Sequence, residues 1–458
     1  MANGQPTIGV AISGGGHRAS LFGLGALLYL IDAGKGAQVG SVASVSGGSL
    51  TNAYFGATVD LSKIDSEGMW DKAKDFAYRI ARRGTLWAAP QTYAYLMSIA
   101  LLVVGAIIVS CRCPWWAIVL AWVIAIVLGG WASQQRSAVV ASAFDTTLLR
   151  RAKLKDMKTE VSHVMCASDL QMGQNVFFSN TFVYSWRSGW GRPGKMRAAR
   201  AAQASAALPG AFSVVSLPLK RFDLPEERVV ALKRNPPRKF KLLDGGVYDN
   251  MGSEWLLNIQ DRLNEGTPPE GLKAVDEAIV VNASAGDEVI ERRWVKVPFV
   301  GEILSLLAVK DVMYRQTTAV RRRLLNVRYQ IAQDRASVKA DAKVLEEALP
   351  GTTLQIDRSP FKLPDDFLGH GDDFSARAQA AIDVLNAGTT GDARAYWATE
   401  SKANRKVKTT LSRIKAARAE SLIRHAYVLT MVNSHVLLDY PLHQIPAPDR
   451  FAGLVAKD

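Results

Sequence analysis

The sequence contains few cysteines and few histidines for its length of 458 residues, three and six respectively. Three cysteines cannot form a disulfide framework in so long a chain, and no cysteine–histidine group has the spacing of zinc ligands. Acidic residues do not occur at the spacing of a calcium-binding loop either. We therefore expect a reduced, intracellular environment and a protein that uses no metal and no other cofactor.

The sequence also lacks the features of a secretory signal and of a disordered chain. Residues 1–7 carry no basic side chain, and Ile8–Ser13 leads directly into a glycine loop, so we expect no signal peptide. Hydrophobic residues make up 48% of the chain and charged residues 21%, as in folded globular proteins. The length predicts two or three domains, or one large domain with insertions.

The charge of the chain is unbalanced, with a formal net charge of +14. Such an excess favours association with nucleic acid or with an anionic membrane surface. No segment interleaves basic and aromatic residues in the manner of a nucleic-acid-binding module, so we expect no nucleic-acid partner. The excess then reflects either attraction to anionic lipids or a solvated basic surface.

Glycines at positions 14–16 follow an apolar run, Thr7–Ser13, that is typical of a short strand. Apolar residues then recur at helical spacing from Leu21 to Ile31. A glycine loop at the start of a helix exposes backbone N–H groups and can bind an anion. The loop lacks the lysine of the Walker phosphate-binding motif and the glycine spacing of the dinucleotide fingerprint. The other chemistry that uses such a loop is an oxyanion hole for acyl transfer.

Ser46 occupies a second strand-to-helix turn, between the apolar run Val39–Val45 and a helical segment that starts at Leu50. The residues two before and two after it, Ser44 and Gly48, are small, as the sharp turn of a nucleophile elbow requires. The turn would also place the Ser46 hydroxyl at a helix N-terminus, which favours developing negative charge. A glycine loop followed by this turn favours an oxyanion hole and a serine nucleophile.

Together these features resemble the patatin-like phospholipase family. Four segments match the family's motifs in the family's order: Gly14–Arg18 with Ser46, Ala167–Ser179, Ala204–Phe212 and Leu242–Asn250. The resemblance covers residues 7–255 and implies an α/β fold, a three-layer α/β/α core with a central, mostly parallel sheet. The sequence departs from the family at Ser44 and Ala19, where the family usually has glycine.

The resemblance also implies the catalytic residues. Ser46 would be the nucleophile and Asp244, in the family's aspartate–glycine motif, its general base, without a histidine. The oxyanion hole would consist of the backbone N–H groups of Gly14, Gly15, Gly16 and Gly47. Arg18 would brace the glycine loop, and no metal is implied.

Two alternatives to this enzyme remain. A Ser-His-Asp triad needs a histidine late in the chain, and His370 is the best placed for that order. A catalytically silent, membrane-bound lipid-binding or scaffold protein would keep the fold without the chemistry. The presence of both Ser46 and Asp244 argues against it, because the fold alone needs neither.

We interpret Asp169 as fixing a turn and Asn250 as capping a helix.

Residues 84–135 contain a single charged side chain, Arg112. Ala94–Ser110 and Trp115–Ser133 are uncharged, and each is close to the roughly 20 residues that cross a bilayer as a helix. The sequence therefore predicts a transmembrane helical hairpin, with a pair of buried core helices as the alternative. Both flanks should face the cytoplasm, because they carry arginines at positions 79, 82, 83, 136, 150 and 151.

We therefore expect four segments. Residues 1–83 and 136–298 would form the two halves of the catalytic domain. Residues 84–135 would form the inserted hairpin, and residues 299–458 would form a mainly helical C-terminal region. The last region would pack on the core or cover the site, and the spacing predicts one helix over residues 405–438. The expected protein is a lipid acyl hydrolase of the phospholipase A or lysophospholipase type. It would be anchored in a bacterial inner membrane, face the cytoplasm and act on lipid of the bilayer.

Overall fold

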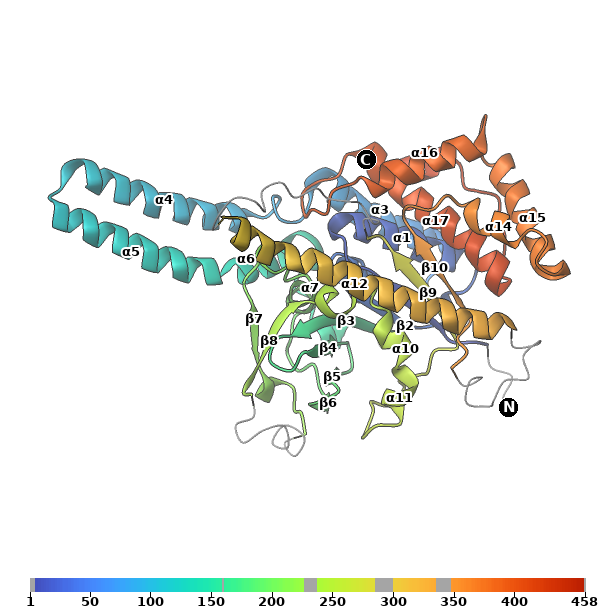
Figure 1. The fold of residues 1–458 in the computed structure, drawn as a ribbon, viewed down its shortest axis with the longest axis horizontal. Coiled ribbons are helices and arrows are strands. Elements are labelled where there is room, and N and C mark those ends of the chain that lie inside the picture. The colour runs from blue at the N-terminus through green and yellow to red at the C-terminus, as the bar shows by residue number, and fades with distance from the viewer. Residues whose placement is uncertain (1–4, 159, 226–236, 285–299, 335–346, 457–458) are drawn as a thin grey trace.

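The computed structural model describes residues 5–158, 160–225, 237–284, 300–334 and 347–456. The fold is a mixed α/β fold in which helices cover both faces of a ten-stranded sheet (Figure 1). The strands are β1 (Ile8–Ile12), β2 (Val39–Val45), β3 (Ser162–Asp169), β4 (Gln174–Phe178), β5 (Val183–Ser185), β6 (Gly189–Gly191), β7 (Val215–Pro218), β8 (Lys239–Asp244), β9 (Glu277–Asn282) and β10 (Gly351–Gln355).

The helices divide into those of the N-terminal part of the chain, those of the hairpin and those of the C-terminal part. The first two groups are α1 (Gly16–Asp32), α2 (Gly48–Thr58), α3 (Ser66–Tyr78), α4 (Pro90–Arg112), α5 (Trp115–Gln134), α6 (Arg136–Phe144), α7 (Ala198–Ser205), α9 (Gly246–Asp249), α10 (Ser253–Leu257) and α11 (Ile259–Leu263). The third group is α12 (Val300–Gln333), α14 (Lys362–Phe367), α15 (Asp372–Ala387), α16 (Ala393–Arg405), α17 (Ala416–Leu438) and α18 (Pro448–Gly453).

The sheet is parallel in one half and antiparallel in the other. Strands β10, β9, β1, β2 and β3 lie side by side and run parallel. Beyond β3 the sheet continues through β4, β5 and β6, and separately through β8 and β7, with antiparallel pairing. The expected α/β core with a central sheet is confirmed. Because tight turns connect β3 to β6 in place of crossover helices, these strands pair antiparallel, so the sheet is less uniformly parallel than expected.

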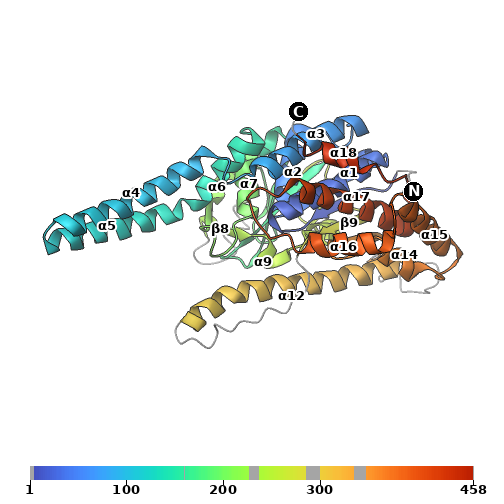
Figure 2. The same cartoon turned by 90° about the horizontal axis from the view of Figure 1, so that it is seen from above.

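Two hydrophobic clusters fill the spaces on the two faces of the sheet. The larger cluster joins the sheet to α1, α2, α3, α7 and α17. The smaller one joins it to α10 and α12 through large side chains such as Trp255 and Tyr329. Figure 2 shows α1, α3 and α17 on one side of the molecule and α12 on the other. The protein is therefore a three-layer structure whose outer layers each contain C-terminal helices.

The register on β3 brings the ends of two other strands together. Strand β2 pairs with β3 up to Val45, which lies opposite Cys166. Strand β8 pairs with the next part of β3, where Asp244 lies opposite Ala167. Because these two positions on β3 are consecutive, β2 and β8 meet end to end. The residue after Val45 is therefore held close to Asp244.

Helices α4 and α5 form an antiparallel hairpin that projects away from the rest of the protein (Figures 1 and 2). Both are long and apolar enough to cross a membrane, and only 6% of the apolar stretch of each is buried inside the protein. Large side chains such as Ile126 and Trp115 are more than two thirds exposed. The alternative of two buried core helices is therefore wrong.

The C-terminal region completes the core instead of forming a separate unit. Strand β10 pairs with β9 at the edge of the sheet, and α17 packs along α1. The helix predicted over residues 405–438 is confirmed from Ala416 to Leu438, as α17, but its predicted start is wrong, because α16 ends at Arg405 and α17 begins only at Ala416. The intervening residues instead make backbone contacts with the glycine loop, as His17 N–H donates to the Thr410 carbonyl. The predicted boundary at residues 298 and 299 lies outside the described residues.

Candidate active site

Ser46 lies on a strained turn between β2 and α2. Its φ angle is 51°, in the left-handed region of backbone conformation that residues other than glycine rarely adopt. The turn leaves no room beside it: a Cβ atom on Gly47 would lie 2.1 Å from the carbonyl oxygen of Gly16. One on Gly48 would lie 2.6 Å from the carbonyl oxygen of Ile12. The two glycines therefore allow the turn to pack directly against the glycine loop.

Hydrogen bonds from three other segments hold this turn. The N–H group of Ser46 donates to Ser205 Oγ at 3.0 Å, at the C-terminal end of α7. Ser20 Oγ on α1 donates to the Gly47 carbonyl at 2.6 Å. Ser44 Oγ donates to the Val164 carbonyl at 3.1 Å and accepts from Asn52 Nδ2 at 2.8 Å. The serine that replaces the family's usual glycine is thus accommodated with its hydroxyl paired.

Asp244 ends β8 beside this turn and is almost completely buried, with 1% of its surface exposed. Its Oδ1 accepts a hydrogen bond from the Gly246 N–H at 2.8 Å. Burial raises the pKa of Asp244 from 3.8 to about 6. The Gly246 N–H and the hydroxyls of Ser46 and Tyr314 oppose this rise in pKa, because they interact favourably with the charged carboxylate. The structure thus brings together Ser46 and Asp244, the two residues expected to react.

The glycine loop at residues 14–16 lies against the same turn. The N–H of Gly14 donates to the Asn250 carbonyl at 2.9 Å, so it is not available to an oxyanion in this structure. Within the described parts of the chain, the N–H groups of Gly15, Gly16 and Gly47 have no such backbone acceptor. Gly15 and Gly16 have φ angles of 141° and 60°, which turn the loop sharply into α1.

Arg18 ties the glycine loop to two distant segments. Its Nε donates to the Ala283 carbonyl at 2.8 Å, just after β9, and its Nη1 donates to the Val407 carbonyl. The side chain is 2% exposed, and burial lowers its pKa to about 10. These contacts place Arg18 where it braces the loop.

The histidines considered for a triad lie in other environments. His17 is buried between the Ser412 carbonyl at 2.8 Å and Thr85 Oγ1 at 3.0 Å, and burial lowers its pKa to about 4. His370 is exposed in the turn between α14 and α15, where its ring packs on Phe367. Among the described residues, no histidine contributes to the shifted pKa of Asp244.

Other polar side chains near the aspartate motif form hydrogen bonds that hold the local structure. Asp169 Oδ1 accepts from the Gln171 N–H at 3.1 Å and so fixes the turn after β3, as expected. Asn250 is the C-cap residue of α9, but its side chain does not cap the N-terminus of a helix. The N–H of Glu254, in the first turn of α10, donates instead to Asp249 Oδ2 at 2.6 Å. Asn250 Nδ2 instead donates to Ser284 Oγ at 2.7 Å.

Tyr314 on α12 is the residue near the site that the sequence did not indicate. Its ring lies over Gly246, where a Cβ atom would come within 2.4 Å of Cε1 of the ring. Its hydroxyl is buried and makes no hydrogen bond of ordinary geometry within the described part of the chain, but it lies close enough to Asp244 to interact with the carboxylate. The only related signal was the helical spacing of this region, which suggested a cover for the site.

Comparisons with known proteins agree with the motifs. A family model described as patatin-like phospholipase matches residues 10–254, which is more than half of the chain. No curated protein matches the chain significantly. Among solved structures, human GIVD cytosolic phospholipase A2 is similar with 13% identity and a TM-score of 0.48, over 94% of this chain and 62% of that one. VipD from Legionella pneumophila is similar with 11% identity and a TM-score of 0.26, over 99% and 90% of the two chains. This chain thus spans about three fifths of the length of the human protein.

Proposed function

Because the chain belongs to the patatin-like phospholipase family, we propose that it is a membrane-anchored lipid acyl hydrolase that cleaves carboxylic ester bonds. The observation that carries this proposal is the pairing of the strained Ser46 with the buried carboxylate of Asp244. A nucleophile and a base within hydrogen-bonding reach are the minimum for covalent catalysis of acyl transfer. A phospholipid or lysophospholipid of the bilayer is the proposed substrate.

In the proposed mechanism Ser46 Oγ attacks the ester carbonyl carbon while Asp244 accepts the serine proton. The carbonyl oxygen becomes an oxyanion, which the N–H groups of Gly15, Gly16 and Gly47 stabilise. Collapse of this intermediate breaks the ester C–O bond, and Asp244 returns the proton to the departing alcohol. Asp244 then deprotonates a water molecule that attacks the acyl-serine, which releases the fatty acid and restores Ser46.

The hairpin of α4 and α5 is proposed to anchor the enzyme in the membrane. Its large apolar side chains are mostly left uncovered by the described part of the chain, and a bilayer would cover them. The flanks carry several arginines, whereas the turn carries only Arg112, so the catalytic domain would face the cytoplasm. The general excess of basic residues would add attraction to anionic lipid, about 1 kcal/mol for each residue near the surface.

The proposal is tested by measuring fatty-acid release from mixed phospholipid vesicles that contain the full-length protein. We expect free fatty acid and lysophospholipid to appear, with no release of headgroup. The matched control is the Ser46→Ala protein prepared in the same detergent. Headgroup release would contradict the proposed bond cleavage, and the absence of any hydrolysis across several lipids would favour the catalytically silent scaffold.

The activity should depend on the ionisation of Asp244. Because a general base must be charged, hydrolysis should fall as the pH drops through about 6, the pKa of Asp244. Tyr314 interacts with the charged carboxylate and lowers this pKa, so Tyr314→Phe should move the acid limb of the pH–rate profile upward, by up to roughly one unit. Tyr329→Phe on the same helix is the control, because that hydroxyl donates to the Thr352 carbonyl. An unchanged acid limb in Tyr314→Phe would contradict this role.

A further inference from the structure

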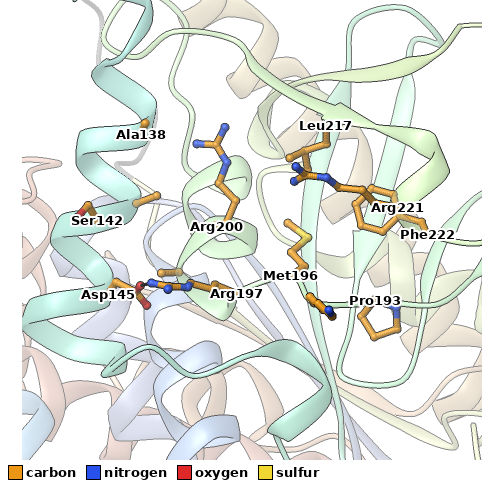
Figure 3. A pocket seen from close by; sticks show the side chains of 14 residues that line it. Ala138, Ser142, Asp145, Pro193, Met196, Arg197, Arg200, Leu217, Arg221 and Phe222 are labelled. Atoms are coloured by element: carbon orange, nitrogen blue, oxygen red, sulfur yellow. Dashed lines mark hydrogen bonds and ion pairs between the residues drawn. The ribbon is translucent and has the colours of Figure 1, made fainter.

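A separate cavity of about 760 Å³ lies between α6, α7 and the short 3-10 helix Leu219–Arg221. Its lining contains four basic side chains and one carboxylate, a net charge of +3. Figure 3 shows Arg200 on α7 and Arg221 on the opposite wall, with the guanidinium of Arg221 directed toward the side of Arg200. Neither Ser46 nor Asp244 lines the cavity, so it is distinct from the proposed active site.

The basic residues of the cavity are only partly neutralised. Asp145 pairs with Arg197. In the described parts of the chain no carboxylate pairs with Lys195, Arg200 or Arg221, and Arg200 Nη1 instead donates to the Gln203 side chain at 3.1 Å. Two guanidinium groups that face one cavity without a carboxylate repel each other, and an anion between them would remove this repulsion.

The surroundings of Arg200 agree with this geometry. Burial lowers the pKa of its guanidinium, and the positive charge of Arg221 lowers it further. The second contribution agrees with the placement of both guanidinium groups at one cavity. A phosphate group suits such a pair, because guanidinium groups bind phosphate oxygens through paired charge-assisted hydrogen bonds.

The remaining walls are apolar and adjoin the hairpin. Leu217 and Phe222 are buried, and Ala138 and Ala141 on α6 line the opposite side. Helix α6 begins at Arg136, directly after α5 ends at Gln134, so the cavity lies at the base of the hairpin. If the hairpin spans the bilayer, its base lies at the depth of the lipid headgroups. Basic pockets beside membrane-spanning helices on the cytoplasmic side suit phospholipid headgroups.

We propose that this cavity binds the phosphate of an anionic phospholipid, with Arg200 and Arg221 as the ligands of the phosphate oxygens. The choice of a lipid over a free phosphate rests on the proposed membrane anchoring, whereas the phosphate chemistry follows from the cavity itself. The site is linked to the proposed nucleophile, because α7 carries Arg200 and ends at Ser205, which accepts the Ser46 N–H.

The test is calorimetric titration of the full-length Ser46→Ala protein in detergent, so that the probe lipids cannot be hydrolysed. The probes are short-chain phosphatidylglycerol, short-chain phosphatidylcholine and inorganic phosphate. We expect phosphatidylglycerol to bind at least about tenfold more tightly than the other two. Arg200→Gln and Arg221→Gln should each weaken its binding about tenfold, the usual effect of losing a charge-assisted hydrogen bond.

Lys220→Gln is the matched control, because Lys220 precedes Arg221, is exposed and does not line the cavity. It should bind like the parent protein, and no variant without lipid should melt below the parent protein, because each arginine substitution removes a repulsion. Equal affinity for inorganic phosphate and phosphatidylglycerol would overturn the lipid assignment. Binding that is insensitive to both arginines would overturn the site. Neither result depends on hydrolysis, so failure of the proposed enzyme activity would be seen separately.

Discussion

Ser46→Ala and Asp244→Asn are each expected to lower the rate of fatty-acid release by about 10³-fold or more. In the proposed mechanism the first removes the atom that forms the acyl-enzyme, and the second removes the base that activates both the serine and the water. Residues that act as a unit are strongly non-additive, so the double variant should be no slower than either single variant. The measurement is the initial rate of release from phospholipid vesicles at pH 8, where Asp244 is ionised.

Asp244→Asn should also change stability, which separates lost chemistry from lost folding. Because the pKa of Asp244 is raised from 3.8 to about 6, its ionisation favours the unfolded chain. The free energy of unfolding of the parent protein should therefore decrease as pH rises from about 4 to about 6. The asparagine variant lacks this loss and should be more stable at pH 8, by up to about 3 kcal/mol. An inactive variant that melts lower than the parent at pH 8 would point to misfolding.

Arginines in the hairpin are expected to abolish stable membrane attachment. Val104 and Ile126 lie on α4 and α5 with 50% and 69% of their surface exposed. An arginine near the middle of a spanning helix costs about 2.5–3.5 kcal/mol on insertion scales, so Val104→Arg with Ile126→Arg should prevent insertion. The measurement is the fraction of protein that stays in the membrane pellet after extraction at alkaline pH.

Leu170→Arg is the matched control for the hairpin. Leu170 is 55% exposed, and it lies in the turn between β3 and β4, outside the hairpin. This variant should stay in the pellet like the parent protein. If the double hairpin variant also resists alkaline extraction, the hairpin is not the anchor. Release of the parent protein by high salt alone would instead indicate attachment through the basic surface, because salt screens such attraction.

The parts of the site that depend on local backbone geometry could be predicted from the sequence. Ser46 needs small neighbours in any chain that makes this turn, and the glycine loop needs residues that adopt positive φ. Composition alone predicted the hairpin, because a run without charge is visible without a fold. The position of Asp244 beside Ser46 came from the order of the family's motifs, and the register on β3 is its physical cause.

The rest depends on contacts between segments far apart in the chain. Tyr314 reaches Asp244 because α12 crosses the face of the sheet, and nothing in its own neighbourhood marks it. Arg200 and Arg221 look like scattered basic residues until the fold places them around one cavity. Strand β10 was missed because the pattern of a short edge strand is weak beside the helices that surround it.

The central position of β1 and β2 constrains the order in which the enzyme can become functional. The ribosome makes these strands before the hairpin, whereas their neighbours β3 and β9 follow only after the hairpin has been synthesised. Until then both edges of the β1–β2 pair stay open, a state that invites pairing with other chains. Early insertion of the hairpin would hold this nascent half at the bilayer, apart from other chains. In the proposed mechanism Ser46 also has no base until β8 is complete, so a growing chain whose hairpin inserted early could not yet hydrolyse the surrounding lipid.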